Sequence, residues 1–420
     1  MRILLLGFGS RGDVQPLVAL GKGLRAAGYD VTLAAGINFQ TWIEREGLTY
    51  EPIHVDVEAL VNSSGGKEWL NDSSDDQRAE MRNMKRMADQ VAGPVSQDLV
   101  RMAQTADVYV SGLMTVAPAD SLAQIYGKQH IHAFLQPFYP TTNGAAGLTA
   151  PLPGRNIFIN RWWGYLVQAI MWNVMRGPTN TLREDVLHLP PGTRGAFIRA
   201  WNRKPTLYGY SEHVVPRPRD WPPHLHITGY WFDAPDETYT PPPALQAFLD
   251  AGDAPVYIGF GSMSNKDPRG TLRTFVEALK KAGRRGILHS GWAGLQAEDL
   301  PDSIYMLDYA PHDWLFPRMA GIVHHGGAGT TASGLRAGVP ATIVAHMGDQ
   351  PFWGRRVHEL GVGPQPIPRH DLSAERLAYA IAQMTTDSAM QARAAALGET
   401  IRAEDGVGNA VRIIGQVVGA

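Results

Sequence analysis

The four-residue motif Gly-Phe-Gly-Ser occurs twice in this chain, at residues 7–10 and 259–262. Each copy follows a short apolar run, residues 3–6 in the first case and 255–258 in the second, and each precedes a segment with helical periodicity. Short apolar runs of this kind are typical of parallel strands that helices bury on both faces. The repeat therefore predicts two α/β halves of similar construction.

A proline-rich segment lies between the two halves. Eight prolines fall between residues 211 and 243, which is a linker composition. We therefore predict a first Rossmann-like domain at residues 1–215, a linker at 216–243 and a second Rossmann-like domain at 244–420.

Composition and charge narrow the classes of function. The chain has 420 residues, of which 44 % are hydrophobic and 19 % charged, and its formal net charge is −2. A globular balance without a basic excess argues against binding of nucleic acid. The chain has no cysteine, which removes disulfides, thiolate zinc sites and cysteine nucleophiles. Residues 3–6 are too few for the core of a signal peptide, and no apolar run reaches membrane-spanning length, so we expect a cytoplasmic protein.

The first glycine-rich turn contains the pattern Gly-x-Gly-x-x-Gly at residues 7–12. The same pattern occurs in NAD sites, where an acidic residue ends the second strand. Here the second strand ends in Ala34-Ala35-Gly36, and Asp13 at the start of the first helix would repel a pyrophosphate. The sequence therefore disfavours NAD. It leaves Asp13 either as a candidate functional residue or as an ordinary cap of a helix N-terminus.

The segment from Val323 to Thr331 predicts an anion site. It leads from an apolar strand through two histidines and two glycines into a helix. Glycines let a ligand approach the backbone closely, and the free amides at a helix N-terminus carry roughly half a positive charge. Thr330 and Thr331 would add hydroxyl donors. The alternative is a glycine turn that only packs a helix on a sheet.

Two polar residues are predicted at the same edge of the sheet as this anion site. Asp349 and Gln350 follow the next apolar run, residues 339–345, and so stand where the next strand should end. Open α/β sheets bind ligands at this edge, so these two side chains are suited to sugar hydroxyls.

The paired histidines could also suggest a metal. Successive strand residues point to opposite faces, however, which argues against one ion shared by His324 and His325.

Residues 157–175 are rich in aromatic side chains. At helical spacing, Trp162, Leu166, Ala169 and Ile170 would form one apolar face, which Arg161, Gln168 and Asn173 interrupt. A core helix explains this pattern. The alternative is a wall or lid over a site for a large apolar ligand, in contact with a membrane surface.

Three motifs taken together resemble glycosyltransferase family one. They are Gly9-Ser10-Arg11-Gly12-Asp13-Val14-Gln15-Pro16, Ala310-Pro311-His312-Asp313-Trp314-Leu315-Phe316-Pro317, and His324 to Thr331 with Gly348-Asp349-Gln350. Within that family they look most like the branch of sterol glucosyltransferases and antibiotic glycosyltransferases. The resemblance covers residues 1–50 and 255–365 and is weak over 55–200. It implies the GT-B fold, an α/β architecture of two Rossmann-like parallel-sheet domains facing each other across a cleft, with a C-terminal helix that crosses back.

The resemblance also implies a nucleotide sugar, usually UDP-linked, in the second domain and an acceptor in the first. Carried over by position, the diphosphate site would comprise Ser262, His325, Gly326, Gly327, Gly329 and Thr330. The uracil would stack on Trp292 or Tyr309. The sugar hydroxyls would meet Asp349 and Gln350, and Trp353 would either line the sugar pocket or belong to the core. The acceptor pocket would comprise Ser10, Arg11, Ser111, Trp162 and Trp163.

By the same resemblance, Asp13 would be the general base and His325 the second catalytic residue. Plant-type members of the family carry a histidine at the position of Asp13, with an aspartate partner. The corresponding region here, Val110-Ser111-Gly112, has no carboxylate. What orients Asp13 is open, with Arg11 a candidate by adjacency. No metal or other cofactor is expected, because the helix dipole and amides would meet the charge of the leaving group.

The expected function is inverting transfer of a sugar, with glucose as the expected sugar, from a UDP-sugar to a hydroxyl of a hydrophobic small molecule such as a sterol, a polyketide, a macrolide or a phenolic. The alternatives are a nucleotide-sugar epimerase or hydrolase of the same fold, an NAD(P)-dependent oxidoreductase and a non-catalytic binding protein. The expected partners are the nucleotide sugar and the acceptor, not nucleic acid. Peripheral contact with a membrane stays open, and the sequence does not indicate an oligomeric state.

Overall fold

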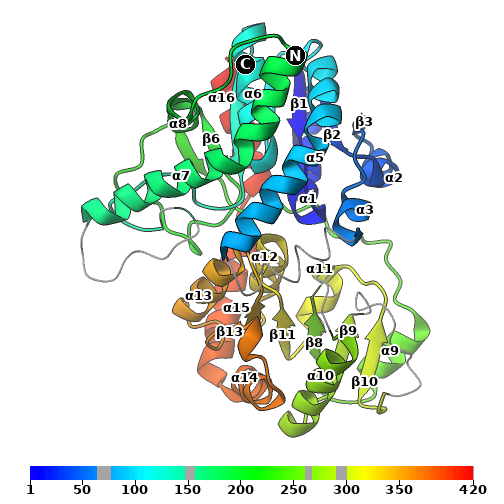
Figure 1. Ribbon diagram of the computed structural model, residues 1–420. Coiled ribbons are helices and arrows are strands. Elements are labelled where there is room, and N and C mark those ends of the chain that lie inside the picture. Colours follow the sequence, from blue (N-terminus) through cyan, green and yellow to red (C-terminus); the bar gives the residue numbers. More distant parts are fainter. Residues whose placement is uncertain (64–76, 146, 148–156, 261–266, 290–299, 420) are drawn as a thin grey trace. The chain divides into compact units, whose positions relative to one another are not determined.

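The computed structural model describes residues 1–63, 77–145, 147, 157–260, 267–289 and 300–419 (Figure 1). These residues form two compact units. The first unit comprises residues 1–63, 81–145, 147, 157–233 and 404–419, and the second comprises 77–80, 234–260, 267–289 and 300–403. Each unit contains one parallel sheet with helices packed on it, so the prediction of two α/β halves is confirmed.

The first unit is built on a seven-stranded parallel sheet in the order β3-β2-β1-β4-β5-β6-β7. The strands are β1 (Arg2–Leu6), β2 (Asp30–Gly36), β3 (Thr49–Ile53), β4 (Val108–Ser111), β5 (Gln129–Phe134), β6 (Thr206–Tyr208) and β7 (Leu225–Ile227). The strand order reverses between β1 and β4, and Leu6 lies opposite Ser111 where both strands end. In open α/β sheets, ligands bind beyond the carboxyl ends of the strands at such a switch point.

Helices cover both faces of this sheet. They are α1 (Arg11–Ala26), α2 (Gln40–Arg45), α3 (Val57–Asn62), α5 (Gln77–Ala103), α6 (Val116–Tyr126), α7 (Ile157–Asn180), α8 (Arg194–Arg203) and α16 (Gly406–Val418). Successive residues of a strand point to opposite faces. Leu5 accordingly packs in the core that contains Leu17 of α1, whereas Leu4 packs in the core that contains Leu99 of α5.

The last helix, α16, belongs to the first unit although it follows the second unit in the sequence. Ile413 and Ile414 are buried in the same core as α1. A Cβ on Gly23 of α1 would lie 2.3 Å from Val407, so the close approach of the two helices requires glycine there. The chain therefore crosses back, as the fold prediction states, and the second unit ends at Ala403 rather than at residue 420.

The proline-rich segment is only partly a connection between the units. Residues 216–233 remain in the first unit, and Leu225–Ile227 within them forms the edge strand β7. An edge strand needs hydrogen-bond donors on one side only, which is why a proline-rich neighbourhood tolerates it. The chain passes into the second unit between Asp233 and Ala234, within the predicted linker of residues 216–243.

The second unit has a six-stranded parallel sheet in the order β10-β9-β8-β11-β12-β13. The strands are β8 (Val256–Gly259), β9 (Gly286–His289), β10 (Ile304–Leu307), β11 (Gly321–His324), β12 (Ala341–Ala345) and β13 (Ile367–Pro368). The helices are α9 (Pro243–Asp250), α10 (Pro268–Ala282), α11 (His312–Leu315), α12 (Ala328–Ala337), α13 (Gln350–Glu359), α14 (Ala374–Thr386) and α15 (Ser388–Arg402). The order reverses between β8 and β11, where Gly259 lies opposite His324. Both copies of the repeated motif thus begin at a switch point.

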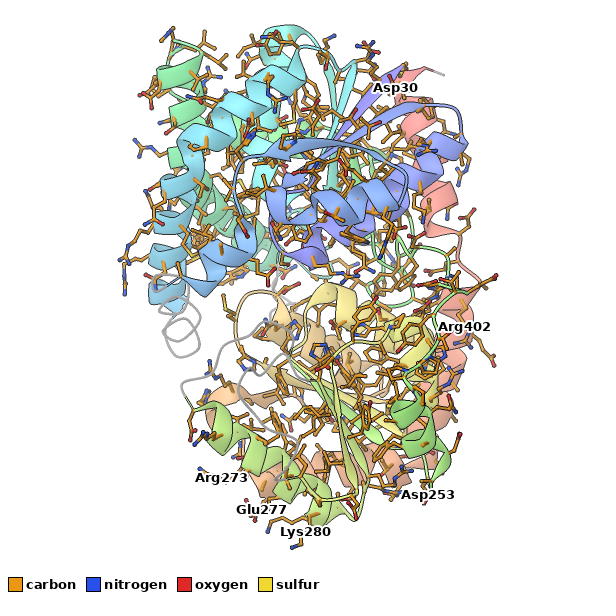
Figure 2. The ribbon with its side chains drawn as sticks, turned by 90° about the vertical axis from the view of Figure 1, so that its right-hand side faces the viewer. Asp30, Asp253, Arg273, Glu277, Lys280 and Arg402 are labelled. Atoms are coloured by element: carbon orange, nitrogen blue, oxygen red, sulfur yellow. The ribbon has the colours of Figure 1, made fainter. Side chains whose placement is uncertain are left out.

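The helices follow from the amphipathic pattern of the sequence, as α10 illustrates. Phe275 and Leu279 are buried in the core of the second unit. Arg273, Glu277 and Lys280 lie on the opposite side of the helix and point away from the sheet (Figure 2). Residues three and four apart share a helix face, so the alternation of apolar and charged residues gives the orientation of this helix.

Candidate functional site

In the second unit, the turn of residues 325–327 joins β11 to α12. Gly326 has φ +95°, and a Cβ at this position would lie 2.6 Å from Ile343, so only glycine fits. Gly327 is the N-cap and brings no side chain to cap the helix. The amide groups of residues 328–330 donate to none of the described residues. Three unpaired N–H groups at the positive end of a helix form a binding site for an anion.

The first turn of α12 is open beside these amides. A Cβ at Gly329 would meet no atom within 4 Å. Thr330, the next residue, is half-buried. Thr331 differs from the prediction, because its buried hydroxyl donates to the carbonyl of Gly327 at 2.9 Å and so stabilises the helix start instead of offering a donor to a ligand.

The side chain of His325 lies against the same turn. A Cβ on Gly327 would be 2.6 Å from Nε2 of His325, so the imidazole covers the start of α12. Burial lowers the pKa of His325 to about 4. At neutral pH the ring is therefore uncharged and can donate one hydrogen bond. His324 has a different role: it is buried, and its Nδ1 accepts the N–H of Gly326 at 3.0 Å, which leaves this nitrogen unavailable to a metal.

Gln350, the first residue of α13, lies beside the turn. A Cβ at Gly326 would be 3.2 Å from the Cβ of Gln350. The side-chain oxygen of Gln350 accepts the N–H groups of His346 at 2.8 Å and Met347 at 3.1 Å. This oxygen therefore closes the loop after β12, and the side-chain NH₂ group is the part that remains for a ligand.

Asp349 precedes Gln350 at the same edge of the sheet. Its Oδ2 accepts the indole N–H of Trp353 at 2.8 Å, one helical turn further on. Trp353 itself is only 1 % exposed. Of the two predicted roles for Trp353, the structure therefore supports the core position, from which the indole holds Asp349 in place.

Of the predicted partners of the nucleobase, Tyr309 can be located. It follows β10, is 55 % exposed, and packs edge-on against Tyr239 with ring centroids 6.5 Å apart. Trp292, the other predicted stacking residue, and Ser262, predicted at the diphosphate, lie outside the described residues. The choice between Tyr309 and Trp292 therefore stays a prediction.

In the first unit, Asp13 is held at the start of α1 by Ser10. Oδ2 of Asp13 accepts the backbone N–H of Ser10 at 2.8 Å and its hydroxyl at 3.0 Å. Gly9 has φ +142°, and a Cβ there would lie 2.4 Å from the same oxygen. Ser10 therefore holds one oxygen of Asp13 in place. The contact is also that of a capping box, so the structure gives Asp13 a structural role, and its catalytic role stays a prediction.

Two other residues predicted for the acceptor pocket are engaged elsewhere. Arg11 lies over the ring of Trp42, with Cζ 4.9 Å from the ring centroid, and its Nε donates to Gln15 at 3.3 Å. Ser111 is fully buried, and its hydroxyl is 2.6 Å from Nε2 of His130. We therefore remove Ser111 from the acceptor pocket, and Arg11 is not the residue that orients Asp13.

The aromatic helix α7 buries a different face from the one predicted. The buried stripe runs through Asn160, Gln168 and Trp172, and the amide of Gln168 pairs with Asn202 of α8 at 2.8 Å. Trp162, by contrast, is 62 % exposed. The periodicity argument failed because Gln168 was counted as an interruption of the apolar face, whereas it is buried with a hydrogen-bond partner.

The exposed side of α7 is aromatic over its first turns. Its large exposed side chains are Phe158, Ile159, Trp162 and Tyr165. Trp163 is half-buried beside them. The core-helix interpretation therefore holds for the part of α7 that contains Trp172 and Met175 but not for the predicted face at Trp162, and a wall for an apolar ligand stays a prediction. None of the helices in the described part of the chain combines the length and the apolar character that crossing a bilayer requires.

One polar cluster in the first unit had no counterpart in the predictions. Asp120 of α6 and His130 and His132 of β5 face one another in the interior. Burial lowers the pKa of His130 to about 4, so its ring is neutral at pH 7. Burial by itself would raise the pKa of Asp120, but the facing histidines outweigh burial and hold it below its ordinary value. The sequence signal was the alternation His-x-His in a strand, which puts both rings on one face.

Solved structures with the same fold are glycosyltransferases. The calicheamicin glycosyltransferase CalG4 superposes with a TM-score of 0.68 at 15 % identity, over 100 % of this chain and 98 % of that one. The glycotransferase of kitacinnamycin gives a TM-score of 0.68 at 18 % identity, over 99 % of this chain and 98 % of that one. These likenesses show the GT-B fold, with two Rossmann-like parallel-sheet domains.

Sequence comparisons point to a narrower group. Residues 3–117 match the glycosyltransferase family 28 N-terminal domain, and residues 288–412 match the C-terminal domain of the erythromycin biosynthesis protein CIII-like family. Sterol 3-beta-glucosyltransferase UGT80A2 of Arabidopsis thaliana is 36 % identical over 98 % of this chain and 65 % of its own length. UGT80B1 of the same plant is 34 % identical over 98 % of this chain and 67 % of its own length.

A fungal relative shows how the lengths differ. Sterol 3-beta-glucosyltransferase of Aspergillus terreus is 34 % identical over 99 % of this chain, which spans 30 % of the length of that protein. The chain thus spans about two thirds of the plant relatives and less than a third of the fungal one. The identities, the two matched domains and the fold agree. The chain belongs to glycosyltransferase family one, in the branch that contains the sterol glucosyltransferases and the antibiotic glycosyltransferases.

Proposed function

We propose that this chain transfers a sugar from a UDP-sugar to a hydroxyl group of a hydrophobic small molecule, with inversion at the anomeric carbon and with no metal or other cofactor in the transfer step. The observation that carries the proposal is the row of amides of residues 328–330 at the switch point of the second sheet, which donate to none of the residues that the structure describes. A pyrophosphate is the ligand that a glycine turn and a bare helix N-terminus suit best.

The donor would bind by its diphosphate and its sugar. The amides of residues 328–330 and the N–H of His325 would meet the negative charge that grows on the β-phosphate as its bond to the sugar breaks. Preorganised donors of this kind are each worth about 3 kcal/mol of transition-state stabilisation. Asp349 would accept hydrogen bonds from sugar hydroxyls, and the NH₂ group of Gln350 would donate one. Trp292 or Tyr309 would stack on the base.

The acceptor step would use Asp13 as the general base. The acceptor oxygen forms a bond to the anomeric carbon on the face opposite UDP, while the bond from that carbon to the β-phosphate oxygen breaks and UDP leaves with the electron pair. The hydroxyl proton passes to Asp13. A carboxylate is a weak base with an ordinary pKa of about 4, so the proton should move late, and the contribution is about 100- to 10,000-fold in rate.

The class of the acceptor is inferred from two observations. Relatives with more than 30 % identity are named sterol 3-beta-glucosyltransferases, which supports glucose as the sugar and a sterol-like acceptor. The exposed aromatic side of α7, with Phe158 and Trp162, supports contact with an apolar molecule or a membrane surface that holds it. An epimerase or hydrolase acting on the nucleotide sugar alone would need no such surface.

A donor and acceptor screen tests the proposal directly. Thermal shifts with UDP-glucose, UDP-galactose and dTDP-glucose should identify the donor, and mass spectrometry with a sterol, a macrolide and a phenolic should detect a product that has gained one hexose. We expect stabilisation by UDP-glucose and glucosylation of the sterol. Release of glucose from UDP-glucose at the same rate with and without acceptors would favour the hydrolase.

The substitution Asp13→Asn separates the catalytic role from the capping role. Asparagine keeps an oxygen that can accept the hydrogen bonds from Ser10, so α1 should start normally. The asparagine side chain cannot take up a proton, however. We expect kcat to fall about 100- to 10,000-fold, with the dissociation constant of UDP-glucose and the melting temperature unchanged. A parallel loss of UDP-glucose binding and thermal stability would show that Asp13 is only a cap.

The substitution Gly329→Asp tests the anion site. The position is open, and an aspartate in the first turn of a helix is favourable for the helix itself. Its carboxylate would compete with the diphosphate for the amides, so we expect UDP-glucose binding to weaken about 10- to 100-fold by calorimetry, in line with one lost charge-assisted contact. Gly329→Ala is the matched control and should bind normally. Equal binding by both variants would place the diphosphate elsewhere.

The low pKa of His325 predicts how donor binding depends on pH. The free chain has a pKa of about 4 at this ring, and a bound diphosphate raises it, because a nearby anion favours the imidazolium form. The complex then holds more protons than the free chain. UDP-glucose should therefore bind more tightly as the pH falls from 7 to 5, by at most about tenfold per pH unit. The variant His325→Gln should lose this dependence, and an unchanged slope would remove His325 from the site.

A further inference from the structure

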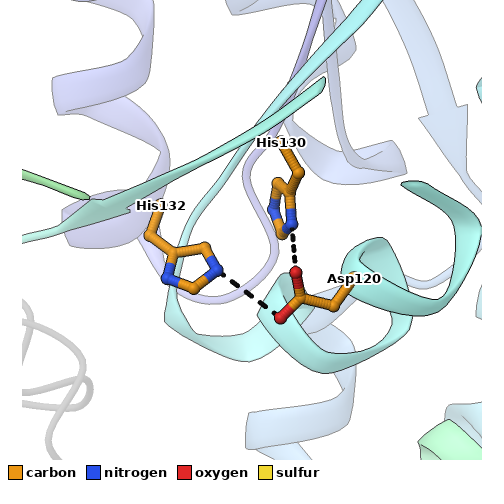
Figure 3. Close-up of side chains that lie close together, drawn as sticks. All are labelled: Asp120, His130 and His132. Carbon is orange, nitrogen blue, oxygen red and sulfur yellow. Dashed lines mark hydrogen bonds and ion pairs between the residues drawn. The ribbon is translucent and has the colours of Figure 1, made fainter. Parts of the chain in front are cut away.

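Asp120, His130 and His132 meet in the interior of the first unit (Figure 3). Nδ1 of His130 is 2.7 Å from Oδ1 of Asp120, and Nε2 of His132 is 3.5 Å from Oδ2. Both imidazoles are fully buried, and the Asp120 side chain is 11 % exposed. Within the described part of the chain, these three residues are the group of His, Asp and Glu side chains that could hold one metal ion. One ligand atom from each residue lies within 4.8 Å of the other two.

Two adjoining elements bring these side chains together. His130 and His132 are two residues apart on β5, so both rings point to the same face of the sheet. The helix α6 precedes β5 and contains Asp120, whose carboxylate points between the two rings (Figure 3). The cluster is therefore held by regular secondary structure on both sides, as a preformed ligand site requires.

Several polar atoms of the cluster lack a hydrogen-bond partner. Oδ2 of Asp120 and Nε2 of His132 are buried and are joined to each other by a long ion pair of 3.5 Å, and the buried Nδ1 of His132 is bonded to no described residue. Buried polar atoms are nearly always paired, and an ionised carboxylate in the interior is costly without a compensating positive charge. A buried carboxylate oxygen held by one long ion pair, beside a ring nitrogen that has no partner among the described residues, is a place that a bound cation would stabilise.

We propose that Asp120, His130 and His132 bind one divalent transition-metal ion of the class of Zn²⁺. Two imidazoles and a carboxylate are a donor set that this class prefers. Ligand atoms that each lie about 2.1 Å from one ion at a tetrahedral angle are about 3.4 Å apart. Binding would therefore keep the 3.5 Å between His132 Nε2 and Asp120 Oδ2 and would widen the 2.7 Å between His130 Nδ1 and Asp120 Oδ1. With three protein ligands, the fourth position is left to a water molecule.

Ser111 supplies the outer contact that such a site needs. Its hydroxyl lies 2.6 Å from Nε2 of His130, which leaves Nδ1 as the nitrogen that faces Asp120. Metal-bound histidines generally donate their second N–H to a neighbouring acceptor, and a serine hydroxyl can accept as well as donate. The ion would replace the proton between Nδ1 and Asp120, so binding would release one proton into solvent. The proposal does not depend on the proposed transfer reaction.

Metal content of the purified full chain tests the proposal. The protein is dialysed against Zn²⁺, then against metal-free buffer, and the metal is measured by mass spectrometry. We expect about one ion per chain, with a melting temperature that falls on chelation and recovers with Zn²⁺. Co²⁺ in place of Zn²⁺ should give visible d–d absorption. A folded wild-type chain that retains no ion would overturn the proposal.

Two substitutions within the cluster and one outside it locate the ion. His132→Phe keeps an aromatic ring beside Phe134, whose ring centroid lies 5.3 Å away, but removes both nitrogens. Asp120→Asn keeps the size of the side chain and removes its charge. Both variants, shown to be folded by circular dichroism, should retain less than about a tenth of an ion. Equal metal content in wild type and either variant would contradict the proposal.

The control is His54→Phe. His54 also pairs with an aspartate, with Nδ1 2.9 Å from Oδ1 of Asp98, but its side chain is 62 % exposed and has no second histidine beside it. This variant removes an Asp–His pair without touching the cluster and should retain the ion. Loss of the ion from His54→Phe, with retention in His132→Phe, would assign the metal to the surface and overturn the proposal.

Discussion

The peptide N–H groups at the start of α12 have no acceptor within the described chain, and the surrounding residues keep them available. The two glycines of the turn remove side chains that would cap the helix, and the hydroxyl of Thr331 turns inward to a carbonyl. Gln350 satisfies the amides of the neighbouring loop with its oxygen. Because an unsatisfied donor costs about 1–3 kcal/mol when it loses water, such a turn favours an anion that replaces that water.

The proposed ligand contacts share one construction. Asp349 is fixed through Oδ2 by Trp353, Gln350 is fixed through its oxygen by two amides, and Asp13 is fixed through Oδ2 by Ser10. In each case a hydrogen bond within the protein holds one side-chain atom and so sets the orientation of the rest of the side chain. Groups whose rotamers are already locked lose little entropy when they bind a ligand, which is what precise placement of a sugar and a hydroxyl needs.

The sequence was sufficient for features that depend on local periodicity or on backbone conformation. The two apolar runs before the repeated motif predicted β1 and β8, and the glycines at 326 and 327 predicted the open helix start. Contacts between distant side chains were not accessible in this way. Gln168 was counted as an interruption of the apolar face of its helix, because its partner, Asn202, lies on another helix and no nearby residue marks the contact. Asp120 and His132 were missed for the same reason.

The repeated scaffold also explains why the two halves should have different roles. Both sheets have a helix that starts at the switch point, α1 after β1 and α12 after β11, and both helices present a positive N-terminus there. In α1 the first turn contains the carboxylate of Asp13, which already neutralises that end, whereas the first turn of α12 contains no acidic residue. We therefore expect the first turn of α1 to repel an anionic donor and the first turn of α12 to attract it. In the proposed reaction, the carboxylate that would keep a diphosphate away from the first half is also the group that would accept the proton there.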